Sequence, residues 1–260
     1  MFTIALTVAA AGVAVEPQPV EAAQKKVVIV VGPVGSMTAG FKRYANEVAE
    51  QATKHGAKVI KVYSPNATWA RVKRAAQGAN VLVYMGHGNG WPSPYGPFQR
   101  RTKNGMGLNA KAGKGNNNYV YYGEKIVASE INLARNAVVL LMHVCYASGN
   151  PEWGQKAPTK SVAKKRVDNF GAGFLRTGAK VVIAETLGKS NYIFDGLFNS
   201  EKTMREIFWS APNAVNEHRM GFKSDRTPGA KALMDPNPQI KGTYWRSIIG
   251  DLDMRATAWR

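Results

Sequence analysis

Short apolar runs that alternate with amphipathic stretches constrain the fold of this chain more than any other feature. The runs are rich in β-branched residues and lie at 26–31, 58–63, 80–85, 137–142 and 179–184. Apolar residues recur at helical spacing between the runs, over 41–56, 66–78 and 161–177. Strands that alternate with helices form βαβ units with right-handed crossovers. The sequence therefore predicts an α/β fold with a mostly parallel sheet and helices on both faces.

Two of these runs end close to a chemically reactive side chain. The run VLVYM is followed by Gly-His-Gly and delivers His87, and the run AVVLLM is soon followed by Cys145. Function in open α/β sheets gathers at the carboxyl ends of the strands, which is where both residues are expected. A thiol beside an imidazole is the arrangement that a cysteine nucleophile requires. The alternative interpretation of Cys145 is a buried core cysteine with no catalytic role.

Cysteine and histidine usage excludes several other kinds of site. Cys145 is the only cysteine, so neither an intramolecular disulfide nor a thiolate metal cluster can form. No zincin spacing and no GxSxG motif occurs, and we expect no metal and no cofactor. His143 lies two residues before Cys145 and is an alternative partner, although a buried histidine with a backbone hydrogen bond is the favoured interpretation. His55 and His218 are interpreted as surface or loop residues.

The charge of the chain is strongly basic and uneven. Lys and Arg number 35 against 17 Asp and Glu, a net charge of +18, and no acidic residue lies between Glu50 and Glu124. A solvated basic surface is the simpler interpretation. The functional one is an electropositive rim around His87 that lowers the pKa of a thiol and attracts acidic ligands. Nucleic acid is the weaker partner, because no nucleic-acid-binding module accompanies the basic residues.

The domain organisation is predicted from breaks in these patterns. Residues 1–24 resemble a secretory signal peptide, and their apolar stretch is too short to span a bilayer, so we expect a secreted protein without a transmembrane segment. Residues 25–212 form the α/β domain, with a long loop at 88–136 that forms a wall or lid of the site. Residues 213–260 are expected as an extension that packs on the domain, with one further strand at 243–249.

The order of these motifs resembles the caspase-like, clan CD cysteine peptidases, which include caspases, metacaspases, legumains, gingipains and clostripain. The shared pattern is an apolar run, His-Gly, a spacer, a second apolar run and a cysteine; here 58 residues separate the two (145 minus 87), and about 50 is typical of caspases. The resemblance implies a three-layer α/β/α sandwich, with His87 as general acid and base and Cys145 as nucleophile. It also implies that the backbone amides of Gly88 and Cys145 form the oxyanion hole. Val144 stands where the family usually has a small residue.

Substrate contacts are predicted from position and charge. The candidates are Trp91, Arg43, Arg100, Arg101 and Glu185. The stretch without acidic residues between Glu50 and Glu124 favours substrates with an acidic or neutral residue before the scissile bond. Glu185 and Asp195 are acidic, so a basic residue at that substrate position is also possible.

The function predicted from the sequence is a secreted cysteine endopeptidase that acts on proteins or peptides. The alternative is an inactive caspase-like binding module whose basic surface binds anionic cell-wall polymer, nucleic acid or an acidic protein. A reactive dyad predicts rapid labelling of Cys145 by iodoacetamide near neutral pH.

Overall fold

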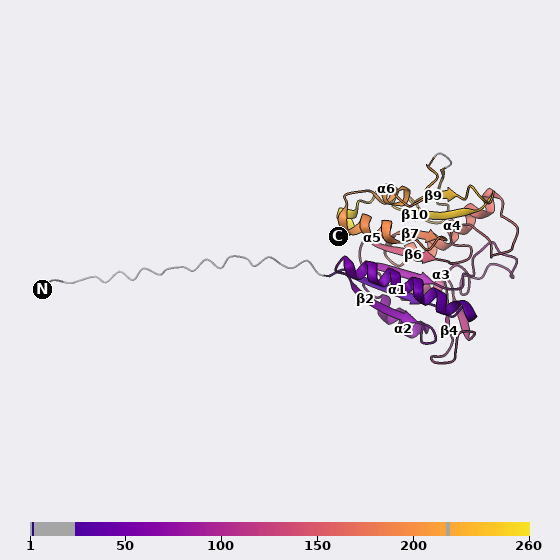
Figure 1. Ribbon diagram of the computed structural model, residues 1–260, viewed down its shortest axis with the longest axis horizontal. Coiled ribbons are helices and arrows are strands. Elements are labelled where there is room, and N and C mark those ends of the chain that lie inside the picture. Colours follow the sequence, from indigo (N-terminus) through magenta and orange to yellow (C-terminus); the bar gives the residue numbers. More distant parts are fainter. Residues whose placement is uncertain (1, 3–23, 217–218) are drawn as a thin grey trace.

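An eight-stranded sheet runs through the centre of the molecule (Figure 1). The computed structural model describes residues 2, 24–216 and 219–260. The strand order is β2-β1-β3-β6-β7-β10-β9-β8, and the first five strands are parallel to one another. These five are β1 (Lys26–Val31), β2 (Lys58–Tyr63), β3 (Val81–Met85), β6 (Ala137–Met142) and β7 (Ala179–Glu185). The parallel strands predicted from the apolar runs are confirmed, with bounds that differ by one residue at most.

Helices cover both faces of the sheet and complete a three-layer α/β/α sandwich. One face carries α2 (Trp69–Ala76), α3 (Glu124–Glu130) and α4 (Lys160–Leu175). The other carries α1 (Thr38–Lys54), α5 (Asn191–Asn199), α6 (Met204–Trp209) and α7 (Ala256–Trp259), and a short 3₁₀ helix, η1 (Gly35–Met37), precedes α1. The predicted fold class is confirmed. No helix in the described part of the chain is long and apolar enough to cross a membrane.

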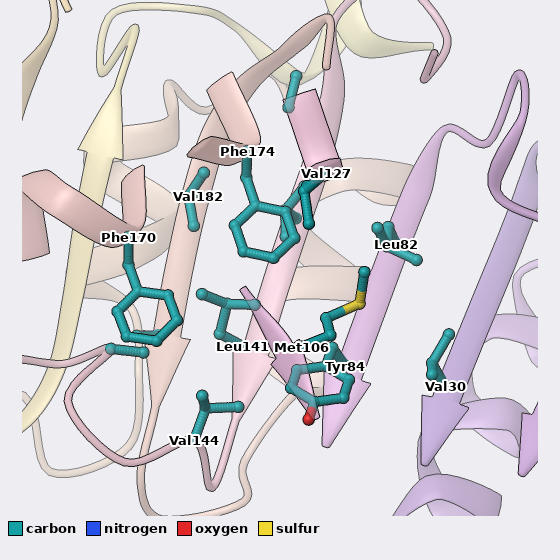
Figure 2. Close-up of a cluster of buried hydrophobic side chains, with 14 of the residues drawn as sticks. Val30, Leu82, Tyr84, Met106, Val127, Leu141, Val144, Phe170, Phe174 and Val182 are labelled. Atoms are coloured by element: carbon teal, nitrogen blue, oxygen red, sulfur yellow. The ribbon is translucent and has the colours of Figure 1, made fainter. Parts of the chain in front are cut away.

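Burial on both faces explains why the strand sequences are continuous apolar runs. Val28 and Val30 of β1 pack on one face, and Val27, Ile29 and Val31 pack on the other. Figure 2 shows Phe170 and Phe174 of α4 over Leu141 and Val182 of the sheet. A strand that is covered on both sides has no solvent face, so its sequence does not alternate between polar and apolar residues.

The C-terminal region belongs to the central sheet. It supplies β8 (Met220–Lys223), β9 (Lys231–Pro236) and β10 (Tyr244–Gly250), and β10 pairs with β7 in the antiparallel direction. The predicted domain boundary at residue 212 is therefore corrected. The strands from residue 220 onward belong to the sheet and do not form a separate extension packed on it. Prolines and buried charged residues interrupt the apolar pattern of these strands, which is why the sequence showed only the strand at 243–249.

The segment at 88–136 is more ordered than the predicted loop. It contains a two-stranded hairpin, β4 (Met106–Asn109) and β5 (Tyr119–Tyr122), followed by α3. These elements have four to seven residues each, too short for a periodic pattern to emerge. The predicted signal peptide lies outside the described residues apart from Phe2 and Gln24, and secretion stays a prediction.

A buried carboxylate ties this segment to the rest of the fold. Glu124 at the start of α3 is fully buried and accepts hydrogen bonds from Arg226 (2.7 Å to each oxygen), Arg100 (2.8 Å) and Asn104 (3.1 Å). Burial alone would raise the pKa of Glu124, but the hydrogen bonds outweigh it and hold the pKa below its usual value.

We expect the Glu124→Gln variant to lose about 1–3 kcal/mol of stability at pH 7. The NH₂ group of glutamine would replace one carboxylate oxygen, and it cannot accept a hydrogen bond from a guanidinium group. The folded-state pKa of Glu124 is lower than the unfolded-state value, so its contribution is present at neutral pH and lost as the pH falls through the folded-state pKa. The difference in stability between the two proteins should therefore shrink below about pH 4.5. Urea unfolding at several pH values measures it, and a constant difference would contradict the assignment.

Candidate active site

The carboxyl ends of β3 and β6 meet at one edge of the sheet. The two strands are adjacent and parallel, and their last residues, Met85 and Met142, are paired in register. His87 follows β3 by two residues and Cys145 follows β6 by three. Both side chains line the same open cleft, of about 600 Å³. The structure thus brings together the two residues that the sequence singled out.

The loops that carry His87 and Cys145 are packed against each other with no room for a side chain between them. A Cβ atom at Gly88 would lie 2.0 Å from the Cys145 carbonyl oxygen and 2.9 Å from Val144. A Cβ at Gly90 would lie 2.2 Å from the Cβ of Tyr146. The glycines that flank His87 and follow it therefore permit this close approach.

The Gly88→Ala variant is expected to lose at least about tenfold in any activity that uses both residues, since even small misplacements are costly in catalysis. The new methyl group must push the Cys145 backbone away from His87. The matched control is Gly40→Ala on α1, where the added methyl meets only the end of the Arg43 side chain at 3.7 Å. Steady-state kinetics of both variants measures the effect. Equal activity in the two variants would show that the close packing is unimportant.

Tyr84, the penultimate buried residue of β3, holds the turn that carries His87. Its hydroxyl lies 2.9 Å from the His87 carbonyl oxygen and 3.1 Å from that of Gly107, and it accepts the Gly107 amide at 2.8 Å. Figure 2 shows the Tyr84 side chain in the cluster, with its hydroxyl near the end of β3. The tyrosine therefore links the His87 turn to the hairpin strand β4.

His87 is half-buried against the hairpin. Its ring lies on Tyr119 of β5, with centroids 4.8 Å apart and planes tilted by 38°. Burial lowers the pKa of His87, and the nearby carboxylate of Glu152 acts in the opposite direction. The imidazole is therefore neutral at pH 7, the form that can accept a proton.

The surroundings of Cys145 favour the protonated form of its thiol. Burial raises the pKa of Cys145 to about 11, the charge of Glu152 adds to the rise, and a hydrogen bond donated by its own backbone amide to the sulfur opposes it. Within the described residues no hydrogen bond joins the thiol to His87. The expectation that a basic rim lowers the pKa of the thiol is therefore corrected, because burial and the carboxylate of Glu152 both raise that pKa. Rapid labelling by iodoacetamide at neutral pH is accordingly no longer expected of the unliganded protein.

Glu152 is the functional candidate that sequence reasoning missed. Its two carboxylate oxygens accept hydrogen bonds from the hydroxyls of Tyr95 (2.8 Å) and Tyr146 (3.0 Å). It therefore connects the segment after His87 to the segment after Cys145. It lies in a Gly- and Pro-rich stretch without periodicity, and the one clue in the sequence is its position seven residues after Cys145.

The oxyanion hole formed by the amides of Gly88 and Cys145 stays a prediction. The amides of Gly88 and Cys145 donate to no carbonyl or side-chain oxygen among the described residues. Two backbone N–H groups close to a reactive thiol are the donors that a developing oxyanion needs.

Four predicted substrate contacts lie outside this cleft. Trp91 stacks on Phe98 and donates its backbone N–H to Asn104. Arg100 binds the buried carboxylate of Glu124. Arg101 is exposed and its carbonyl accepts the amide of Gly123, and Arg43 is exposed on α1. None of these four side chains lines the cleft, and their role as substrate contacts stays a prediction.

The acidic candidates are also held elsewhere. Glu185 is the last residue of β7, as expected, but it is buried, with Arg246 at 3.0 Å and the Tyr192 hydroxyl at 3.1 Å. Asp195 pairs with His55 at 3.0 Å on the α1 and α5 side of the sheet. A carboxylate that is already paired in the interior is not free to recognise a substrate, and this corrects the assignment of Glu185.

His143 does not lie on the strand as the sequence suggested. β6 ends at Met142, and His143 has a φ of 53°, so the alternation of strand side chains does not apply to it. Its ring lies between Phe41 and Tyr44, and its Nε2 has no hydrogen-bond partner among the described residues. Its backbone amide, not its ring, makes the hydrogen bond, to the Glu185 carbonyl. Burial lowers the pKa of His143.

No group of three or more potential metal ligands occurs among the described residues. In comparisons with known proteins, no family model matches this chain and no curated protein is significantly similar to it. The chemistry of this site therefore has to be argued from its own geometry.

Proposed function

We propose that this protein is a cysteine peptidase of the caspase-like type, with Cys145 as nucleophile and His87 as general acid and base. The observation that supports this most directly is the placement of both residues in one cleft by adjacent strands β3 and β6. The three-layer sheet and the order of the two residues along the chain agree with the resemblance noted in the sequence. Export from the cell belongs to the same proposal.

The protonation states define how the reaction would begin. The Cys145 thiol is protonated and His87 is neutral, so the imidazole takes the thiol proton as the sulfur attacks the peptide carbonyl. The amides of Gly88 and Cys145 donate to the carbonyl oxygen as it becomes negative. His87 then protonates the leaving amine, and a thioester remains on Cys145. Water attacks the thioester, with His87 accepting its proton, and releases the acid product and the thiol.

A peptide library incubated with the wild-type protein and with Cys145→Ala tests the proposal. We expect new peptide termini with the wild type and none with the variant. Circular dichroism of both proteins controls for folding. Equal cleavage by both proteins, or no cleavage by the wild type, would refute the peptidase assignment.

A second candidate function, a binding module for polyanions, is supported by a separate groove. This groove of about 580 Å³ lies between edge strand β2 and helix α2 and is lined by Lys26, Lys61, Arg71 and Arg74. No acidic residue lines it, and the side chains of Arg71 and Arg74 have no hydrogen-bond or ion-pair partner among the described residues. A groove of this charge suits an anionic polymer.

Retention on heparin resin in rising salt tests the groove. We expect the double variant Arg71→Ala and Arg74→Ala to elute at lower salt than the wild type, since such contacts are screened by ions. The matched control removes two exposed charges from the hairpin, Lys111→Ala with Lys114→Ala. Equal shifts in both double variants would show that net charge alone causes retention and would exclude a groove site.

A further inference from the structure

Two clefts meet at Cys145, and Glu152 borders both. The cleft that contains His87 lies on one side, and a second cleft of about 390 Å³ lies on the other. The residues common to the two are Cys145, Glu152 and Trp153. A peptide that presents a bond to Cys145 and occupies both clefts therefore passes next to the Glu152 carboxylate.

Glu152 is the charge that a ligand in these clefts would meet. Among the described residues, the other charged side chain in the lining is Lys103, which is 4% exposed. Its Nζ donates to the side chains of Asn89 (2.8 Å) and Ser93 (3.0 Å) and to the carbonyl of Tyr95 (2.7 Å). The lining histidines, His87 and His143, are neutral at pH 7 because burial lowers the pKa of each.

The Glu152 carboxylate is held in position but retains capacity for a ligand. Tyr95 and Tyr146 each donate one hydroxyl to a different carboxylate oxygen. An ionised carboxylate has about four acceptor positions, so roughly two remain. Among the described residues no Lys, Arg or His forms an ion pair with it. A partly exposed carboxylate with no cation of its own favours a cationic ligand.

Aromatic side chains that line the larger cleft together with Glu152 favour the same kind of ligand. Tyr95 and Tyr119 are about half exposed, and Trp153 is fully exposed. Aromatic faces attract ammonium and guanidinium groups, and they also bind the methylene stem of lysine or arginine.

We propose that Glu152 is the specificity-determining residue of this site and selects peptides that carry a lysine or arginine side chain close to the scissile bond. This inference rests on the proposed peptidase function. It replaces the expectation of an acidic or neutral residue, which was based on the acid-free window around His87. Glu152 lies outside that window in the sequence, and the fold brings it to the cleft.

Matched peptide substrates test the inference. We expect kcat/KM to be about 10- to 100-fold higher for a lysine peptide than for its norleucine counterpart, the range given by one charge-assisted hydrogen bond. Arginine should likewise exceed citrulline. In Glu152→Gln this ratio should fall towards one, and in Glu152→Lys a glutamate peptide should become the best substrate of the set. The ratio within each protein cancels any general loss of activity, and Glu47→Gln on the exposed surface of α1 is the control.

Binding of the same peptides to Cys145→Ala, with and without Glu152→Gln, separates this inference from the peptidase proposal. Calorimetry should show tighter binding of the lysine peptide only while Glu152 is present. If the wild type cleaves peptides and its lysine preference survives in Glu152→Gln, the proposed role of Glu152 is wrong and the peptidase proposal stands. Cleavage with no lysine preference would lead to the same conclusion. Selective binding that needs Glu152, without cleavage of any peptide, would overturn the peptidase proposal and support the cation site. The absence of both would overturn both.

Discussion

Replacing His87 with alanine is expected to lower kcat/KM for peptide hydrolysis by about 10²- to 10⁴-fold, the usual contribution of general acid and base catalysis. Among the described residues, His87 is the one imidazole that lines the larger cleft with Cys145. Since the thiol has a pKa of about 11, Cys145 depends on a neighbouring base to lose its proton at neutral pH. Steady-state kinetics with a cleavable peptide measures the loss.

The pH dependence of the wild type follows from the same assignment. Burial lowers the pKa of His87 from the usual value of 6.5, so the neutral imidazole persists below that pH. Activity should therefore rise with pH through a midpoint below 6.5 and stay high at pH 7. The matched control is His55→Ala, at the α1 and α5 side of the sheet, which should retain wild-type activity. Equal losses in the two histidine variants would contradict the role of His87.

Replacing Arg246 with methionine is expected to cost about 3–5 kcal/mol of the free energy of unfolding, as is typical when one partner of a buried ion pair is removed. Arg246 on β10 is fully buried, with Glu185 of β7 at 3.0 Å and Asp235 of β9 at 3.3 Å. It joins the parallel part of the sheet to its antiparallel part. The variant would keep two buried carboxylates without their arginine.

The variant should also respond to pH in a distinctive way. Burial already raises the pKa of Glu185, and Arg246 opposes this. Without the arginine the folded-state pKa lies further above the unfolded-state value. Stability is then present at low pH and is lost as the pH rises through the folded-state pKa. Urea unfolding should show Arg246→Met to be more stable at pH 5 than at pH 8.

The control for this prediction is an exposed ion pair between β9 and the turn that follows β10. Lys231 of β9 lies 3.2 Å from Asp253 at the surface, and Lys231→Met should cost less than about 1 kcal/mol. A similar loss in both variants would show that the buried position of Arg246 has no special importance.

The part of the fold that could be predicted from the sequence is the part with the simplest physics. The five parallel strands are buried on both faces, and burial on both faces requires the continuous apolar runs that identify them. The strands β9 and β10 contain Asp235 and Arg246, which are buried because they pair with each other and with Glu185. Pairing across strands leaves no mark in a local pattern, so these strands were harder to recognise.

The candidate site also contains residues that could be predicted from the sequence and residues that could not. His87 and Cys145 were predicted to meet because each follows an apolar strand, and the ends of parallel strands share one edge of the sheet. Glu152 and Tyr95 come from segments without periodicity, and only the folded structure shows that they lie beside the thiol. The pKa of Cys145 depends on burial and on that carboxylate, neither of which a sequence displays.

If Cys145 and His87 act as one catalytic unit, a double-mutant cycle will show it. Peptide hydrolysis is measured for the wild type, Cys145→Ala, His87→Ala and the double variant. Residues that act as a unit give strongly non-additive losses. We expect the double variant to be no less active than Cys145→Ala alone, near the uncatalysed rate. Losses that add on a logarithmic scale, or hydrolysis that persists in Cys145→Ala, would contradict this expectation.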